Sequence, residues 1–129
     1  MFADQKGFTL VEVMIVVLII GLLAIIAAPN LIRARVTAND TAAQAALKTI
    51  CIALENYASD NSAYPPDTTS LVGATPPYLN VDYFTGTHSG FTFTSAFTDL
   101  TYSVTAIPVS PNKGTASFTI STGGILVQN

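Results

Sequence analysis

The sequence predicts an α+β fold, in which one long N-terminal α-helix packs against a small antiparallel sheet of about three or four strands. Three observations predict it. The residues from Phe8 to Ala28 form an apolar run, an amphipathic stretch follows, and segments of alternating apolar and hydroxyl residues fill the last third. With 129 residues, the chain has room for one such domain.

The first element is the apolar run, in which only Thr9 and Glu12 are polar. A helix of this length spans about 32 Å, close to the roughly 30 Å hydrocarbon core of a bilayer. Residues 8–30 are therefore predicted to cross a membrane, with lipid as their partner before any assembly. A cleaved secretory signal is the alternative, but such signals have shorter apolar regions, and here the helical pattern continues past Ala28.

The second element, residues 31–60, is predicted to be an amphipathic continuation of the same helix. Apolar side chains recur there at steps of three and four residues, which places them on one helix face: Leu47, Ile50, Cys51, Leu54 and Tyr57. Cys51 lies on this face and is interpreted as a buried structural thiol rather than a reactive one. Asn61 and the prolines after it end the helix.

The third element, residues 61–129, is predicted to be a head of loops and strands with one helical turn near Thr69–Val72. Alternation of apolar residues with Ser or Thr indicates strands that bury one face. The expected strands are Phe91–Thr94, Tyr102–Ala106, Ser117–Ile120 and Ile125–Val127. Their apolar face should cover the helix face that carries Leu47 and Leu54.

The sequence contains few residues of the types that form catalytic or metal-binding sites. His88 is the sole histidine, and the loop aspartates Asp67, Asp82 and Asp99 are isolated, so no metal site is expected. Phosphate-binding and nucleophile-elbow motifs are absent from the sequence, which predicts no catalytic residue, no cofactor and no enzymatic function. The net charge of −3 also disfavours nucleic-acid binding.

Two features exceed what a membrane anchor needs. Lys6-Gly7 directly precedes the apolar run, and because glycine lacks a Cβ, the backbone there can lie extended in a protease cleft. Glu12 lies inside the run, where an ionisable side chain costs about 2.5–3.5 kcal/mol at the bilayer centre and less near its edge. Glu12 is therefore a functional candidate, unless it simply reaches water at the headgroups.

The N-terminal segment resembles the signature of type IV pilins and type II secretion pseudopilins. The similarity covers roughly residues 6–40 and includes Lys6-Gly7, the run Phe8–Val17, Ile19–Ala24 and Pro29. It implies that residues 1–7 are a prepilin leader with a class III signal. A prepilin peptidase would then cleave between Gly7 and Phe8 and methylate the new Phe8 amine.

The resemblance also implies a role for Glu12 in assembly, where it would neutralise the Phe8 amine of a neighbouring subunit. A buried carboxylate and a buried ammonium are each costly alone, and pairing offsets part of that cost. A subunit in the wrong axial register would leave both charges unpaired. Glu12 would then select the correct register.

Gly21 and Pro29 weaken the helix between them, since glycine has low helix propensity and proline removes a hydrogen bond. Filaments of this family are often extended there, so we expect local melting within Gly21–Pro29 on assembly. A simple proline kink in a continuous helix is the alternative.

Three functions remain at this stage. The first is a major pilin, polymerised from the bacterial inner membrane by an assembly platform and ATPase into an extracellular type IV pilus for adhesion, twitching motility or DNA uptake. The second is a type II secretion pseudopilin, which would form a periplasmic pseudopilus. The third is a membrane-tethered periplasmic binding module. The Ser/Thr-rich strands, and the lack of acidic residues after Asp99 for a calcium loop, favour the pilin.

Overall fold

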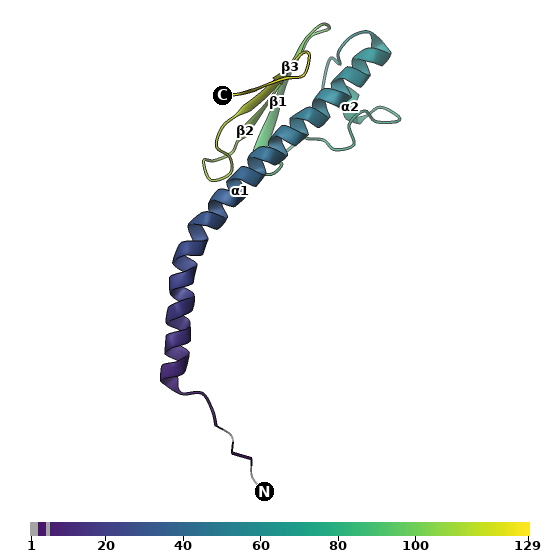
Figure 1. Ribbon diagram of the computed structural model, residues 1–129. Helices are drawn as coiled ribbons and strands as arrows, with labels where there is room; N and C mark the ends of the chain where they lie inside the picture. Colours follow the sequence, from purple (N-terminus) through teal and green to yellow (C-terminus); the bar gives the residue numbers. More distant parts are fainter. Residues whose placement is uncertain (1–2, 5) are drawn as a thin grey trace. The chain divides into compact units, whose positions relative to one another are not determined.

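A computed structural model describes residues 3–4 and 6–129 of the chain (Figure 1). It divides into two compact units, Met1–Ala34 and Arg35–Asn129. The elements, in chain order, are α1 (Leu10–Asn61), α2 (Thr69–Val72), β1 (Phe91–Phe97), β2 (Tyr102–Pro108), β3 (Phe118–Ser121) and β4 (Ile125–Gln128). The predicted α+β fold is confirmed, with a single long helix and a four-stranded sheet.

The first unit contains the apolar front of α1. Every large apolar side chain from Phe8 to Ile32 is at least half exposed, and the helix is long and apolar enough to cross a membrane. The helix continues through Gly21 and Pro29 in the single chain. Asn30 Nδ2 donates to the Ile26 carbonyl at 3.2 Å. So much exposed apolar surface requires a covering of lipid or of other helices.

The second unit buries the rear half of α1 against the sheet. Leu47, Ile50 and Leu54 are fully buried on the helix side. Opposite them, the strands contribute the buried side chains Phe91, Phe93, Tyr102, Val104, Phe118 and Ile120. The helix face predicted from the three- and four-residue spacing is therefore the face that the sheet covers.

The sheet is an antiparallel meander in the order β1-β2-β3-β4. Buried and less buried residues alternate along β1 to β3, as the sequence pattern predicts. β1 runs three residues further than expected, to Phe97, which pairs with Tyr102 at the start of β2. The turn Thr98–Thr101 closes this hairpin, because the Thr98 N–H donates to the Thr101 carbonyl at 2.8 Å. The expected helical turn at Thr69–Val72 is present as α2.

Shortening the buried face of α1 should destabilise the second unit strongly. Leu47→Ala removes a fully buried side chain and should lower the free energy of unfolding by about 3 kcal/mol, within the usual range for such cavities. Ile52→Ala is the matched control on the same helix, because Ile52 is 62% exposed and its loss should cost under about 0.5 kcal/mol. Urea unfolding of the detergent-solubilised chain measures both, and equal losses would contradict this core.

Candidate functional site

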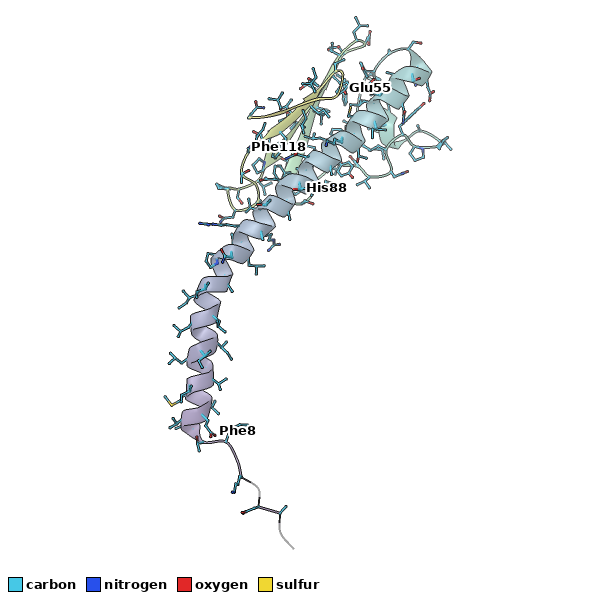
Figure 2. The ribbon with its side chains drawn as sticks, in the orientation of Figure 1. Phe8, Glu55, His88 and Phe118 are labelled. Carbon is cyan, nitrogen blue, oxygen red and sulfur yellow. The ribbon has the colours of Figure 1, made fainter. Side chains whose placement is uncertain are left out.

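The Gly7–Phe8 peptide lies just outside α1, which begins at Leu10. Phe8 is 90% exposed, and a Cβ built on Gly7 would meet no atom within 4 Å. Figure 2 shows Phe8 at the start of the helix, next to the non-helical segment that precedes it. The peptide bond at which cleavage is expected is therefore accessible and free of helical structure.

Thr9 and Glu12 form a reciprocal pair at the first turn of α1. The Thr9 N–H donates to Glu12 Oε2 at 2.8 Å, and the Glu12 N–H donates to Thr9 Oγ1 at 3.2 Å. This is a capping box, which satisfies two of the backbone donors that a helix start leaves unpaired. Glu12 also benefits from the positive end of the helix dipole. The Thr-x-x-Glu spacing is a recognisable sequence signal for a capping box. This local role of Glu12 was not among those predicted from the sequence.

Phe8 and Glu12 lie together in one groove beside the first turns of α1. Val13, Ile15 and Val16 complete its lining, which is wholly apolar, so Glu12 contributes its methylene groups to the groove and its exposed carboxylate lies beside it, held by the Thr9 N–H. Such a groove suits a partner that brings an apolar surface together with a positive group, because a cation would compensate the carboxylate when water leaves. Gly21 and Pro29 lie further along α1 and do not line this groove.

A second polar contact fastens the segment between β2 and β3 to α1. Asp40 is buried, and its carboxylate accepts the Thr115 N–H at 3.0 Å and the Thr115 hydroxyl at 2.6 Å. Beside it, Asn39 Nδ2 donates to the Lys113 carbonyl at 2.9 Å. The pairing joins residues about 75 positions apart and has no local signal, so the sequence did not predict it.

Cys51 is half-buried and belongs to a polar network rather than to the apolar core alone. Its Sγ lies 3.1 Å from the Tyr102 hydroxyl, which also donates to Glu55 Oε1 at 3.3 Å. The Tyr64 hydroxyl donates to the same carboxylate oxygen at 3.1 Å, and Figure 2 labels Glu55 on α1. Burial, Cys51 and Glu55 raise the pKa of Tyr102 far above its usual value, and burial with Glu55 raises the pKa of Tyr64.

This network predicts a loss of stability at alkaline pH. An unfolded chain releases tyrosine protons near about pH 10, whereas folded Tyr102 keeps its proton to higher pH. The contribution of these tyrosines to the free energy of unfolding should therefore be constant below about pH 9 and fall as the pH rises past about 10. Tyr102→Phe should remove most of that decline. Urea unfolding at several alkaline pH values tests this, and an unchanged decline in Tyr102→Phe would contradict the assignment.

The described residues, 3–4 and 6–129, hold no group of three or more His, Cys, Asp or Glu side chains placed to bind a metal. His88 instead packs edge-on against Tyr83, with ring centroids 5.3 Å apart, and its Nε2 lies 3.1 Å from the Thr85 carbonyl.

Residues 2–28 match the family model described as the prokaryotic N-terminal methylation motif. The chain is 42% identical over 69 residues to the type IV wide pilus major component PilA4 of Thermus thermophilus, covering 54% of this chain and 53% of that protein. It is 44% identical over 62 residues to the type II secretion system core protein G of Pseudomonas aeruginosa, covering 48% and 44%.

The type IV major pilin protein PilA of Myxococcus xanthus is 39% identical over 72 residues, covering 56% of this chain and 32% of that protein. The chain thus spans about half the length, or less, of these relatives. Pili and a secretion system are both represented among them. The matched methylation motif contains Gly7, Phe8 and Glu12.

Proposed function

We propose that this chain belongs to the type IV pilin and pseudopilin family, which its methylation motif and its relatives support, and that it is the major subunit of a type IV pilus. Subunits of this family are structural and are not enzymes. The observation that carries the proposal is the site at the start of α1, where an accessible Gly7–Phe8 bond precedes a carboxylate beside an apolar groove.

Processing comes first in the proposed mechanism. A prepilin peptidase removes residues 1–7 and methylates the amine of Phe8. The exposure of Phe8 and the open space around Gly7 support this step, because a protease must hold the scissile peptide in an extended form. Cleavage leaves a cationic amine within four residues of Glu12.

Assembly then places the Phe8 amine of one subunit against Glu12 of another. Among the described residues 3–4 and 6–129, the donor to Glu12 is the Thr9 N–H, through Oε2, so the capping box leaves the second oxygen for an incoming cation. Burial of either charge alone costs several kcal/mol, and pairing in a dry helix bundle offsets part of it. The requirement for this pair fixes the axial register of the subunits.

The exposed apolar helix supplies the filament core. In the inner membrane, lipid covers the side chains from Phe8 to Ile32, and in the filament the same side chains contact neighbouring helices. When an assembly platform and its ATPase extract the subunit, neighbouring helices replace lipid around these side chains. The single chain is helical from Gly21 to Pro29, so melting of this stretch on assembly stays a prediction about the filament.

A pseudopilin of a type II secretion system is the second candidate, favoured by the similarity to core protein G. The pilin is preferred because the outer face of the sheet is rich in hydroxyl side chains and free of charge, as the cross-strand row Thr94, Thr105 and Thr119 illustrates. Such a face suits the surface of a long exposed fibre. A membrane-tethered binding module is the remote third candidate, since a tether has no need of Gly7 or Glu12.

Shearing of whole cells that express the chain tests the proposal. A pilin should appear as long fibres in the sheared fraction by electron microscopy and immunoblotting. Retention of the processed chain in the cell envelope would instead support the pseudopilin. A monomeric chain with no multimers in either fraction would contradict both and leave the tether.

A further inference from the structure

The charged residues of the unit Arg35–Asn129 are segregated along the axis of α1. Arg35 and Lys113 lie at its basal end, because the Lys113 carbonyl accepts Asn39 Nδ2. Asp60 lies in the last turn of α1, and Asp99 lies just beyond it, because the Asp99 carbonyl accepts the Tyr64 N–H at 3.1 Å. The part of α1 from residue 39 to its C-terminal end is about 33 Å long at 1.5 Å per residue. Positively charged residues therefore lie at the basal end of the unit, and acidic residues lie at its distal end.

The remaining charges do not cancel this asymmetry. Lys48 lies midway along the helical part of the unit, and Glu55 and Asp67 belong to the distal end. At the basal end the negative charge of Asp40, whose carboxylate accepts the Thr115 N–H and hydroxyl, offsets part of the positive charge of Arg35 and Lys113. Asp82 is exposed and accepts the Phe84 N–H and the Thr85 hydroxyl. The basal end, with Arg35, Lys113 and Asp40, is therefore net positive, and the distal end, with Glu55, Asp60, Asp67 and Asp99, is net negative.

Helix stability does not explain the acidic distal end. The negative end of the helix dipole lies there, and it favours basic side chains in the last turn. The last turn of α1 has none and instead contains Asp60. Asp60 Oδ2 accepts the Tyr78 hydroxyl at 2.8 Å, which stabilises the carboxylate within the unit but does not cancel its charge. A cationic surface of another molecule is therefore favoured at that end.

The distal end also presents a rigid apolar side chain. The turn Thr98–Thr101 is held by the Thr98 N–H, which donates to the Thr101 carbonyl at 2.8 Å, and by the Thr101 N–H, which donates to Thr98 Oγ1 at 2.9 Å. Leu100 at its tip is 81% exposed, next to Asp99. In Figure 1 this turn lies at the same end of the unit as the C-terminal end of α1.

The basal end offers a matching surface in the link between β2 and β3. An open hollow there is lined by Pro108, Val109, Ser110, Pro111, Gly114 and Thr115. Lys113 lies in the same link but outside this lining. Asp40 and Asn39 hold this link to α1, so the hollow is preformed. A partly apolar hollow in a link that carries a lysine complements an exposed leucine beside an aspartate.

We propose that the Asp99–Leu100 turn of one copy docks on the Pro108–Thr115 link of the next copy, with Leu100 in the hollow and Asp99 beside Lys113. Because the two surfaces lie at opposite ends of the unit, the contact is heterologous and repeats as an open line instead of closing as a dimer. The inference rests on the proposed self-assembly and assigns the contact that stacks the heads along the fibre axis.

Charge reversal in the full-length chain tests the contact. Asp99→Lys and Lys113→Glu should each lower the yield of sheared fibres by about fivefold and make the fibres dissociate at lower NaCl concentration. The double variant should restore both readouts, because the pair is regenerated with its signs exchanged. In Lys113→Glu, the glutamate keeps the Cβ and Cγ atoms that pack against Gly90 in the wild type. The substitution should therefore preserve the loop.

Leu100→Ser tests the apolar part without touching charge. Its matched control is Val127→Ser, which removes a half-exposed apolar side chain from β4, away from both ends of the unit. Leu100→Ser should lower fibre yield, and Val127→Ser should not. Since Leu100 is largely exposed, protease resistance of the detergent-solubilised variant should equal that of the wild type.

The outcomes distinguish a failure of the docking contact from a failure of the proposed pilin function. Wild-type fibres together with unchanged yields in all the single variants would overturn the docking contact and leave the pilin function standing. A double reversal that is worse than either single reversal would also overturn the contact. A wild-type chain that forms no multimers would overturn the proposed function itself.

Discussion

Replacing Glu12 by Gln should reduce the fibres in the sheared fraction by at least about tenfold while leaving the chain folded and processed. Gln keeps an oxygen that can accept the Thr9 N–H, so the capping box survives. The negative charge is lost, and the Phe8 amine of the neighbouring subunit then enters the helix bundle without a counterion. A buried unpaired charge costs several kcal/mol, and about 1.4 kcal/mol already corresponds to a factor of ten.

Thr9→Ala is the matched control for this prediction. It removes the hydroxyl that accepts the Glu12 N–H and costs about 1 kcal/mol of helix capping, but the carboxylate charge remains. Thr9→Ala should therefore assemble much better than Glu12→Gln. Normal fibres from Glu12→Gln, with poor fibres from Thr9→Ala, would show that Glu12 acts through its local cap and not through its charge.

Replacing Gly7 by Val should block processing, so that nearly all of the chain keeps residues 1–7 and fibre yield falls to less than about a tenth. A β-branched side chain restricts the backbone and adds bulk where the protease holds its substrate extended. The folded chain itself should tolerate the change, because a Cβ on Gly7 meets nothing within 4 Å.

Gly21→Val is the matched control for Gly7→Val. A Cβ on Gly21 also meets nothing within 4 Å, and the position lies inside the apolar segment that follows Gly7, away from the cleavage bond. The mass of this variant should show complete removal of residues 1–7. Equal processing of the two variants would remove Gly7 from the protease recognition site.

Local patterns in the sequence predicted most of the fold. Leu47, Ile50 and Leu54 recur at helical spacing, and burial against a sheet is the main way such a face is stabilised in water. The alternation in Phe91-Thr92-Phe93-Thr94 likewise defines an inward and an outward face, which the burial pattern of β1 confirms. In both cases, residues close in sequence carry the whole signal.

Contacts between distant residues were not predictable in this way. The Asp40–Thr115 clamp joins positions 75 residues apart, and an aspartate on a helix gives no sign of its partner. The extension of β1 to Phe97 depends on its pairing with Tyr102 and on the hydrogen bonds of the Thr98–Thr101 turn. The Thr9–Glu12 capping box, by contrast, is local and could have been recognised from its spacing.

The candidate site could be predicted from the sequence because Gly7 and Glu12 are residues that a simple membrane anchor does not need. The axial separation of Asp60 and Asp99 from Arg35 and Lys113 emerged only from the fold. It depends on which loop contacts which end of α1, through Tyr64 at one end and Asn39 at the other.

Intact-mass and N-terminal analysis of the chain from sheared cell-surface material tests the central claim most directly. The pilin assignment predicts a chain that begins at N-methylated Phe8, with residues 1–7 absent, in long fibres released by shearing. A functional protein that keeps residues 1–7 and forms no fibres would contradict it, because neither the Phe8 amine nor its pairing with Glu12 could then exist.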